Sequence, residues 1–127
     1  MLPLLAIGPA PLQLEHVAAA VAAGSEADAD GAVVTFLGLV RNHNLGRSVR
    51  YLEYEAYEPL ALKAFARISA EIGERWPTAR LALHHRIGRL EVGEASVAYR
   101  MVISGVTCPS SAISACSDMP ALARAVA

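Results

Sequence analysis

The chain of 127 residues is poor in lysine and cysteine, and each shortage excludes a class of protein. Lys63 is the only lysine, and no lysine or arginine precedes Arg41. With a formal net charge of −1, the whole chain has no field that attracts nucleic acid or an anionic membrane. The two cysteines, Cys108 and Cys116, are too few for a disulfide scaffold and lack the CxxC spacing. We expect reduced, partly buried thiols that serve packing.

Long apolar runs and known catalytic motifs are also missing. No apolar stretch reaches the length of a transmembrane helix, and the N-terminal MLPLLAIG is short and lacks the basic residues that begin a signal peptide. These features predict a cytoplasmic protein. The sequence contains no GxGxxG, P-loop, GxSxG or HExxH string, so no motif of this kind indicates a catalytic class.

Composition and patterning predict one α+β domain over residues 1–127, since 54% of the residues are hydrophobic and can fill a core. The predicted helices span 12–24 and 59–76, and the predicted strands span 31–40, 49–56, 80–88 and 90–103. The second helix carries an apolar stripe of Leu62, Phe65, Ile68 and Ile72. The order of strands and helices fits a mostly antiparallel sheet, in which strands 31–40 and 49–56 form a hairpin with a long polar tip.

The tip of this hairpin, Arg41-Asn42-His43-Asn44, is the most informative local feature. The planar guanidinium of arginine suits bidentate binding of a phosphate or carboxylate, and asparagine amides match the donors and acceptors of a heterocycle. The alternative is a polar loop whose side chains are simply solvated, which is common at such tips. The residues alone leave both interpretations open, with the solvated loop the more frequent case.

Two other groups of polar residues favour plain structural roles. His84 and His85 are adjacent in a strand, so their side chains point to opposite faces and cannot bind one metal together. We expect one hydrogen-bonded core histidine, one surface histidine and no metal site. The arginines and tyrosines between residues 41 and 57 could bind RNA, but glutamates are interleaved among them, which argues against a phosphate-tracking stripe.

Three blocks in a fixed order carry a family resemblance: GAVVTFLGLVRNHNLGRSV, LEYEAYEPLALKAF and HRIGRLEVGEASV. They resemble the large, catalytic subunits of molybdopterin synthase, the MoaE family. The resemblance covers about residues 7–98, and residues 99–127 form a divergent tail. It implies an α/β hammerhead fold and a homodimer within a heterotetramer that holds a small, ubiquitin-like, MoaD-like sulfur-carrier subunit.

The reaction that the resemblance implies belongs to molybdenum cofactor biosynthesis. Sulfur passes from the thiocarboxylated C-terminus of the small subunit to cyclic pyranopterin monophosphate, which becomes the dithiolene of molybdopterin. The resemblance implies no metal and no other cofactor for this step. It matches Leu39, Val40 and Arg41 to a substrate-binding stretch, with Arg41 as the anion-binding residue and Asn42 and His43 in supporting roles.

The tail departs from the family pattern. The family's substrate-binding His-Arg pair and its late catalytic lysines have no counterpart here, because Arg124 is the only basic residue from Met101 onward. The catalytic residues are therefore unassigned. Three explanations remain open: a truncated or frame-altered chain, a divergent member that completes its site with another chain, or a non-catalytic paralogue that dimerises or binds a partner. The first is favoured and predicts weak or no activity for this chain alone.

Overall fold

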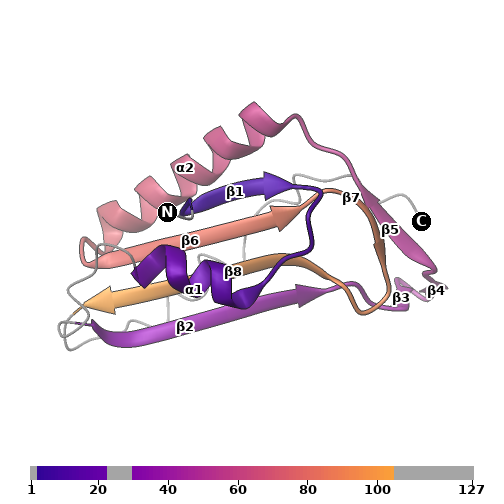
Figure 1. Ribbon diagram of the computed structural model, residues 1–127, viewed down its shortest axis with the longest axis horizontal. Helices are drawn as coiled ribbons and strands as arrows, with labels where there is room; N and C mark the ends of the chain where they lie inside the picture. Colours follow the sequence, from indigo (N-terminus) through magenta and orange to yellow (C-terminus); the bar gives the residue numbers. More distant parts are fainter. Residues whose placement is uncertain (1–2, 23–29, 105–127) are drawn as a thin grey trace.

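Two helices pack on opposite faces of a four-stranded sheet in the computed structural model, which describes residues 3–22 and 30–104 (Figure 1). The elements in chain order are β1 (Leu5–Gly8), α1 (Leu14–Ala22), β2 (Asp30–Leu39), β3 (His43–Asn44), β4 (Arg47–Ser48), β5 (Tyr51–Tyr54), α2 (Glu58–Arg75), β6 (Ala79–Arg86), β7 (Gly88–Glu91) and β8 (Ala95–Ser104).

The sheet has the strand order β1-β6-β8-β2. Strand β1 is parallel to β6, whereas β6 with β8 and β8 with β2 are antiparallel. The predicted α+β fold with a mostly antiparallel sheet is therefore confirmed. Two short two-stranded ribbons, β3-β4 and β5-β7, lie beyond one end of this sheet (Figure 1).

Helix α1 packs against small side chains on one face of the sheet. Val17, Ala20 and Val21 of the helix pack on three sheet residues, which are Ala82, Ala98 and Val102. Alanines at the contact allow the nine-residue helix to approach the strands closely, so even a short helix is buried along one side.

Larger side chains on the other face form the main core beneath α2. Phe65 and Ile72 of the helix pack against Leu81, Leu83, Tyr99, Met101 and Ile103 of the sheet. Pro59 lies in the first turn of the helix, where its missing N–H costs nothing, and Trp76 caps its end just before Pro77. One member of the predicted apolar stripe is wrong: Leu62 is 37% exposed, and Ala61 occupies the buried position.

The predicted pairing of strands 31–40 and 49–56 is wrong. Strand β2 pairs with β8 along its whole length, and β5 pairs with β7. The reason is burial, because apolar β2 is covered on one side by joining the main sheet, while alternating β5 forms a half-buried ribbon with β7, whose Leu90 is fully buried. Only the tip forms a hairpin, in which Leu45 and Gly46 have φ of 49° and 76°, as in a type I′ turn.

The strand predicted over 90–103 is in fact two strands. Gly93 has a φ of 91° and turns the chain between β7 and β8, so that each strand joins a different sheet. Cys108, Cys116 and the rest of residues 105–127 lie outside the described residues, as does the loop at 23–29. Across the described parts of the chain, no helix is long and apolar enough to cross a membrane.

Candidate functional site

The five residues that the sequence singled out follow one another where β2 ends. Leu39 is the last residue of the strand and is 54% exposed, whereas the side chain of Val40 is buried at 3%. Arg41, Asn42 and His43 are exposed. The structure therefore sets one buried anchor, Val40, directly before three solvent-facing polar side chains.

Backbone hydrogen bonds fix both sides of this short loop. The N–H of Val40 donates to the carbonyl of Glu94 at 2.9 Å, and the carbonyl of Val40 accepts from the N–H of Gly93 at 2.8 Å. Farther along, the N–H of Val49 donates to the carbonyl of Asn42 at 2.8 Å. The polar side chains thus project from a backbone that is held on the β7–β8 turn and closed at its base.

The side chains of the loop leave much of their hydrogen-bonding capacity open. Arg41 Nη2 reaches Asn44 Oδ1 at 3.4 Å, which is a long contact, and within residues 3–22 and 30–104 no ion pair joins Arg41 to a carboxylate. His43 Nδ1 lies 2.8 Å from Asn42 Oδ1. An amide oxygen only accepts, so Nδ1 carries the proton and Nε2 of the neutral ring can accept from a ligand.

Charged groups below the loop are paired with one another. The carboxylate of Glu94 lies 3.2 Å from Arg86 Nη1, and that of Glu91 lies 2.8 Å from Arg89 Nε. The pKa of Glu94 is lowered, first by the hydrogen bond from the N–H of Glu91 and then by Arg86. Since these carboxylates already have cationic partners, the charge of Arg41 is left available to an incoming anion.

Sequence reasoning did not assign roles to Arg86 and Glu94. Both stand in the block HRIGRLEVGEASV, which carried the family resemblance. The available signal was the Gly-Glu pair at the end of an apolar segment, since Gly93 marks a turn and Glu94 can cap it. Their convergence with Val40 depends on sheet pairing that the sequence does not reveal.

The two adjacent histidines lie on opposite faces of β6, as predicted. Buried His84 places Nε2 2.8 Å from the carbonyl of Pro3, so it is the expected core histidine. His85 was expected at the surface and is half-buried instead. Its Nδ1 donates to the carbonyl of Arg86 at 2.8 Å, and Tyr54 packs edge-on at 5.3 Å between ring centroids. Burial lowers the pKa of His85, although the hydrogen bond to Arg86 opposes this shift, so burial favours the neutral form of the imidazole.

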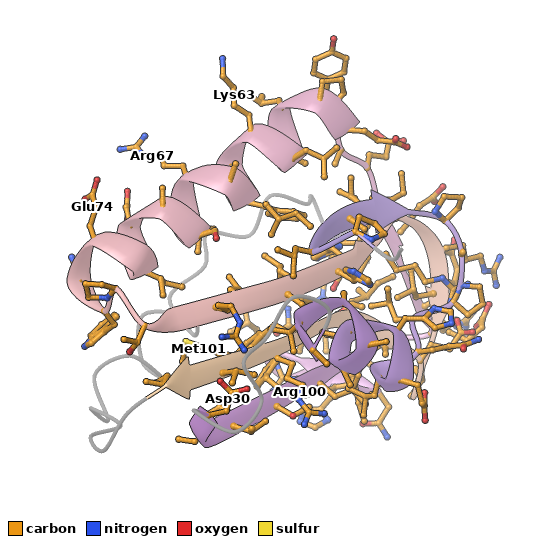
Figure 2. The ribbon with its side chains drawn as sticks, turned by 60° about the vertical axis from the view of Figure 1, so that its left-hand side comes forward. Asp30, Lys63, Arg67, Glu74, Arg100 and Met101 are labelled. Atoms are coloured by element: carbon orange, nitrogen blue, oxygen red, sulfur yellow. The ribbon has the colours of Figure 1, made fainter. Side chains whose placement is uncertain are left out.

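A cavity of about 220 Å³ beside β1 is lined in part by His16, His84 and His85. Their presence raises the question of a metal, but nowhere in the described residues do three histidine, cysteine, aspartate or glutamate side chains group to hold one. Lys63, the only lysine of the chain, is not among the residues that line this cavity. Figure 2 shows Lys63, with Arg67 and Glu74, extending from α2 on the side away from the sheet.

The fold and this loop define an α+β domain that presents an exposed arginine from a rigid strand end. A family model described as "MoaE protein" matches residues 7–119, and the chain belongs to this family. The resemblance found in the sequence is thereby confirmed, and the matched stretch extends past residue 98.

Individual relatives agree with the family. The molybdopterin synthase catalytic subunit of Nostoc sp. is 46% identical over 110 residues, which cover 84% of this chain and 61% of that relative. The crystal structure of molybdopterin synthase from Staphylococcus aureus has a TM-score of 0.71 and 35% identity, over 86% of this chain and 74% of that one. A complex of subunits 1 and 2 of molybdopterin-converting factor from Helicobacter pylori shares the fold, with a TM-score of 0.67 and 19% identity, over 91% of this chain and 73% of that one.

Proposed function

We propose that this chain acts as the catalytic subunit of a molybdopterin synthase. In this proposal it takes sulfur from the thiocarboxylated C-terminus of a small MoaD-like subunit and directs it to cyclic pyranopterin monophosphate, in the cytoplasm. Family membership supports the reaction class, and the Nostoc relative carries the name of that subunit. The observation that carries the proposal is exposed Arg41, which forms no ion pair with any carboxylate of residues 3–22 and 30–104 and directly follows its buried anchor Val40.

The role proposed for Arg41 follows from the charge of the reactants. The precursor bears a cyclic phosphate and the sulfur donor is a thiocarboxylate, so two anions must approach one another. A guanidinium that is held in place offsets part of this repulsion, and each charge-assisted hydrogen bond contributes roughly 1.5–3 kcal/mol. The sulfur is already a nucleophile, so the large subunit mainly positions it and the precursor.

The neighbours of Arg41 suit the polar ring system of a pterin. Exposed Leu39 offers an apolar surface beside the loop. The amide nitrogen of Asn42 can donate and His43 Nε2 can accept, because their other polar atoms bond to each other. Val40 supports this surface from below through its buried side chain and its two backbone hydrogen bonds.

The protons of the reaction have no assigned carrier. Lys63 extends from α2 away from the sheet, so we give it no catalytic role. The chain spans 61% of the length of the Nostoc relative. Because no residue is assigned to carry these protons, we propose weak or no turnover for this chain alone, with the domain of residues 1–127 supplying the substrate-anchoring part of the site.

The same observations favour a second candidate from another class. A MoaE-family chain without an assignable catalytic lysine could serve as a partner-binding or dimerisation module. Such a module would bind the small subunit, as the two subunits named in the Helicobacter pylori complex associate, and would not form product. We keep it as the alternative function.

One experiment separates these candidates. The chain is mixed with thiocarboxylated small subunit and cyclic pyranopterin monophosphate, and both subunit affinity and molybdopterin formation are measured. Synthase function predicts precursor binding that Arg41→Ala weakens at least tenfold, whereas the matched change Arg47→Ala in the same hairpin leaves it unchanged. Subunit binding without precursor binding or product would support the module and reject the synthase.

A further inference from the structure

We propose that Glu94 and Arg86 are positioning residues that set the place of Arg41. Neither side chain belongs to the Arg41 loop, and the effect passes through the backbone of Val40. The importance of Arg41 for an anionic precursor rests on the proposed function. The structural link between Glu94 and Arg41 rests on geometry alone. It can therefore be tested separately from the role of Arg41 in precursor binding.

The carboxylate of Glu94 makes two different contacts, one with each oxygen. Oε2 accepts from the N–H of Glu91 at 2.7 Å and closes the β7–β8 turn, in which Gly93 takes its left-handed conformation. Oε1 lies 3.2 Å from Arg86 Nη1. The backbone of the turn adds a third bond, from the N–H of Glu94 to the carbonyl of Glu91 at 3.1 Å.

Arg86 ties this turn to the rest of the domain. It is the last residue of β6, and its side chain is only 14% exposed. While Nη1 meets Glu94, Nε donates to the carbonyl of Pro9 at 3.2 Å, just after β1. One planar guanidinium therefore holds the chain just after β1 and the β7–β8 turn at the same time, through two nitrogens at a fixed angle to each other.

The β7–β8 turn also holds the start of the Arg41 loop. Gly93 and Glu94 supply both backbone partners of Val40, and Val40 immediately precedes Arg41. If the Glu94 carboxylate is removed, the turn loses its Glu91 cap and its tie to Arg86. The backbone of Val40 then gains freedom, and the exposed side chain of Arg41 sweeps a wider volume.

Loss of the Glu94 carboxylate should affect the orientation of Arg41 much more than the stability of the fold. Glu94 is 41% exposed, and partly exposed ion pairs contribute little to global folding. Orientation of a binding group is far more sensitive, because small displacements at a binding site weaken ligand contacts strongly. We therefore expect Glu94→Ala to loosen Arg41 while the domain stays folded.

The test uses the full chain and compares three variants. Glu94→Ala removes both contacts. Glu94→Gln keeps an oxygen for the N–H of Glu91 but loses the ion pair. Arg67→Ala is the control, because it breaks the exposed ion pair with Glu71 on α2, far along the chain from the loop. NMR measures hydrogen exchange at the Val40 and Gly93 amides and the order parameter of the Arg41 amide.

The proposal predicts at least tenfold faster exchange at Val40 and Gly93 in Glu94→Ala. It also predicts an Arg41 order parameter that falls from about 0.85 to below about 0.6. Glu94→Gln gives an intermediate result and Arg67→Ala gives none. An unchanged Arg41 order parameter in a folded Glu94→Ala variant would overturn the proposal, whether or not the chain binds precursor.

A second readout joins the inference to function. Where the wild-type chain binds cyclic pyranopterin monophosphate, Glu94→Ala should raise the dissociation constant about as much as Arg41→Ala does, and Glu94→Gln should restore part of the affinity. Unchanged affinity in Glu94→Ala would reject positioning. Absence of binding by the wild type would reject the proposed function, while the NMR result still decides the link between Glu94 and Arg41.

Discussion

Phe36 of β2 and Tyr99 of β8 stack across the two strands, with ring centroids 5.1 Å apart and ring planes at 12°. Tyr99 is 2% exposed and belongs to the core beneath α2, whereas Phe36 is 42% exposed at the edge of the sheet. The pair fixes the register of the edge strand that ends at Leu39 and so supports the Arg41 loop.

The stacked pair predicts unequal losses of stability. Tyr99→Ala should lower the free energy of unfolding by about 3–5 kcal/mol, because it leaves a cavity in the core. Phe36→Ala should cost about 1–2 kcal/mol, since half-exposed Phe36 loses mainly its stacking and part of its apolar contact. Urea denaturation of the two variants measures both. Equal losses would mean that Phe36 is more deeply packed than its exposure indicates.

The close approach of Gly38 in β2 to Val97 in β8 predicts that substitutions at these two positions are coupled. A Cβ at this position would lie 2.7 Å from Val97 Cγ1, and the β-branched side chain of Val97 has little freedom to turn away. Gly38→Ala should therefore destabilise the domain by about 1–3 kcal/mol.

The coupling has a direct check in a double-mutant cycle. Val97→Ala removes the clashing methyl group, so Gly38→Ala should cost at least about 1 kcal/mol less in that background than in the wild type. Unfolding free energies of the four proteins give the coupling. Additive effects would show that the cost of Gly38→Ala arises elsewhere, for example at Phe36, whose Cε1 would lie 3.3 Å away.

The backbone conformation of Leu45, at the tip of the β3–β4 hairpin, predicts that a substitution at this position will stabilise the domain. Its φ of 49° is unfavourable for a leucine, and its side chain is 93% exposed, so it gains little in return. Leu45→Asn should stabilise the domain by about 0.5–1 kcal/mol, because asparagine tolerates this conformation. Gly46→Ala, at a φ of 76°, should destabilise by about 1 kcal/mol. Thermal unfolding measures both, and stabilisation by Gly46→Ala would contradict the turn geometry.

Several features of the fold could be read from the sequence because they depend on local patterns. The helix that carries Phe65 follows from its apolar period and from Pro59 and Pro77 at its ends. The pairing of β2 with β8 could not be read, since it brings together segments that are distant in the chain. An apolar pattern indicates that a segment is a strand but not which strand it pairs with. The predicted partner, the adjacent segment 49–56, was therefore wrong.

The candidate site divides in the same way. Arg41, Asn42 and His43 stand together in the sequence, and a polar cluster after a strand was enough to single them out. The residues that hold them do not stand together: Pro9, Arg86 and Glu94 meet only after β1, β6 and β8 are aligned. A sequence shows the groups that face a ligand more readily than the supports that converge on them from separate strands.

The lowered pKa of His85 predicts how the free energy of unfolding depends on pH. Burial lowers the pKa of His85 below its ordinary value of 6.5, although the hydrogen bond to the carbonyl of Arg86 opposes this shift. The unfolded chain therefore binds a proton at His85 over a pH range in which the folded chain does not. Stability should be fully present above pH 6.5 and should fall as the pH drops towards the lower folded pKa.

The variant His85→Gln isolates this contribution. Urea denaturation near pH 7.5 and near pH 5 gives the loss of unfolding free energy for each protein, and the loss should be smaller for His85→Gln. The other histidines are common to both proteins and cancel in the comparison. Glu94, whose pKa is lowered from 4.5, loses its contribution only at more acidic pH and does not enter this range. An equal pH dependence in the two proteins would show that His85 is protonated as easily in the folded domain as in the unfolded chain.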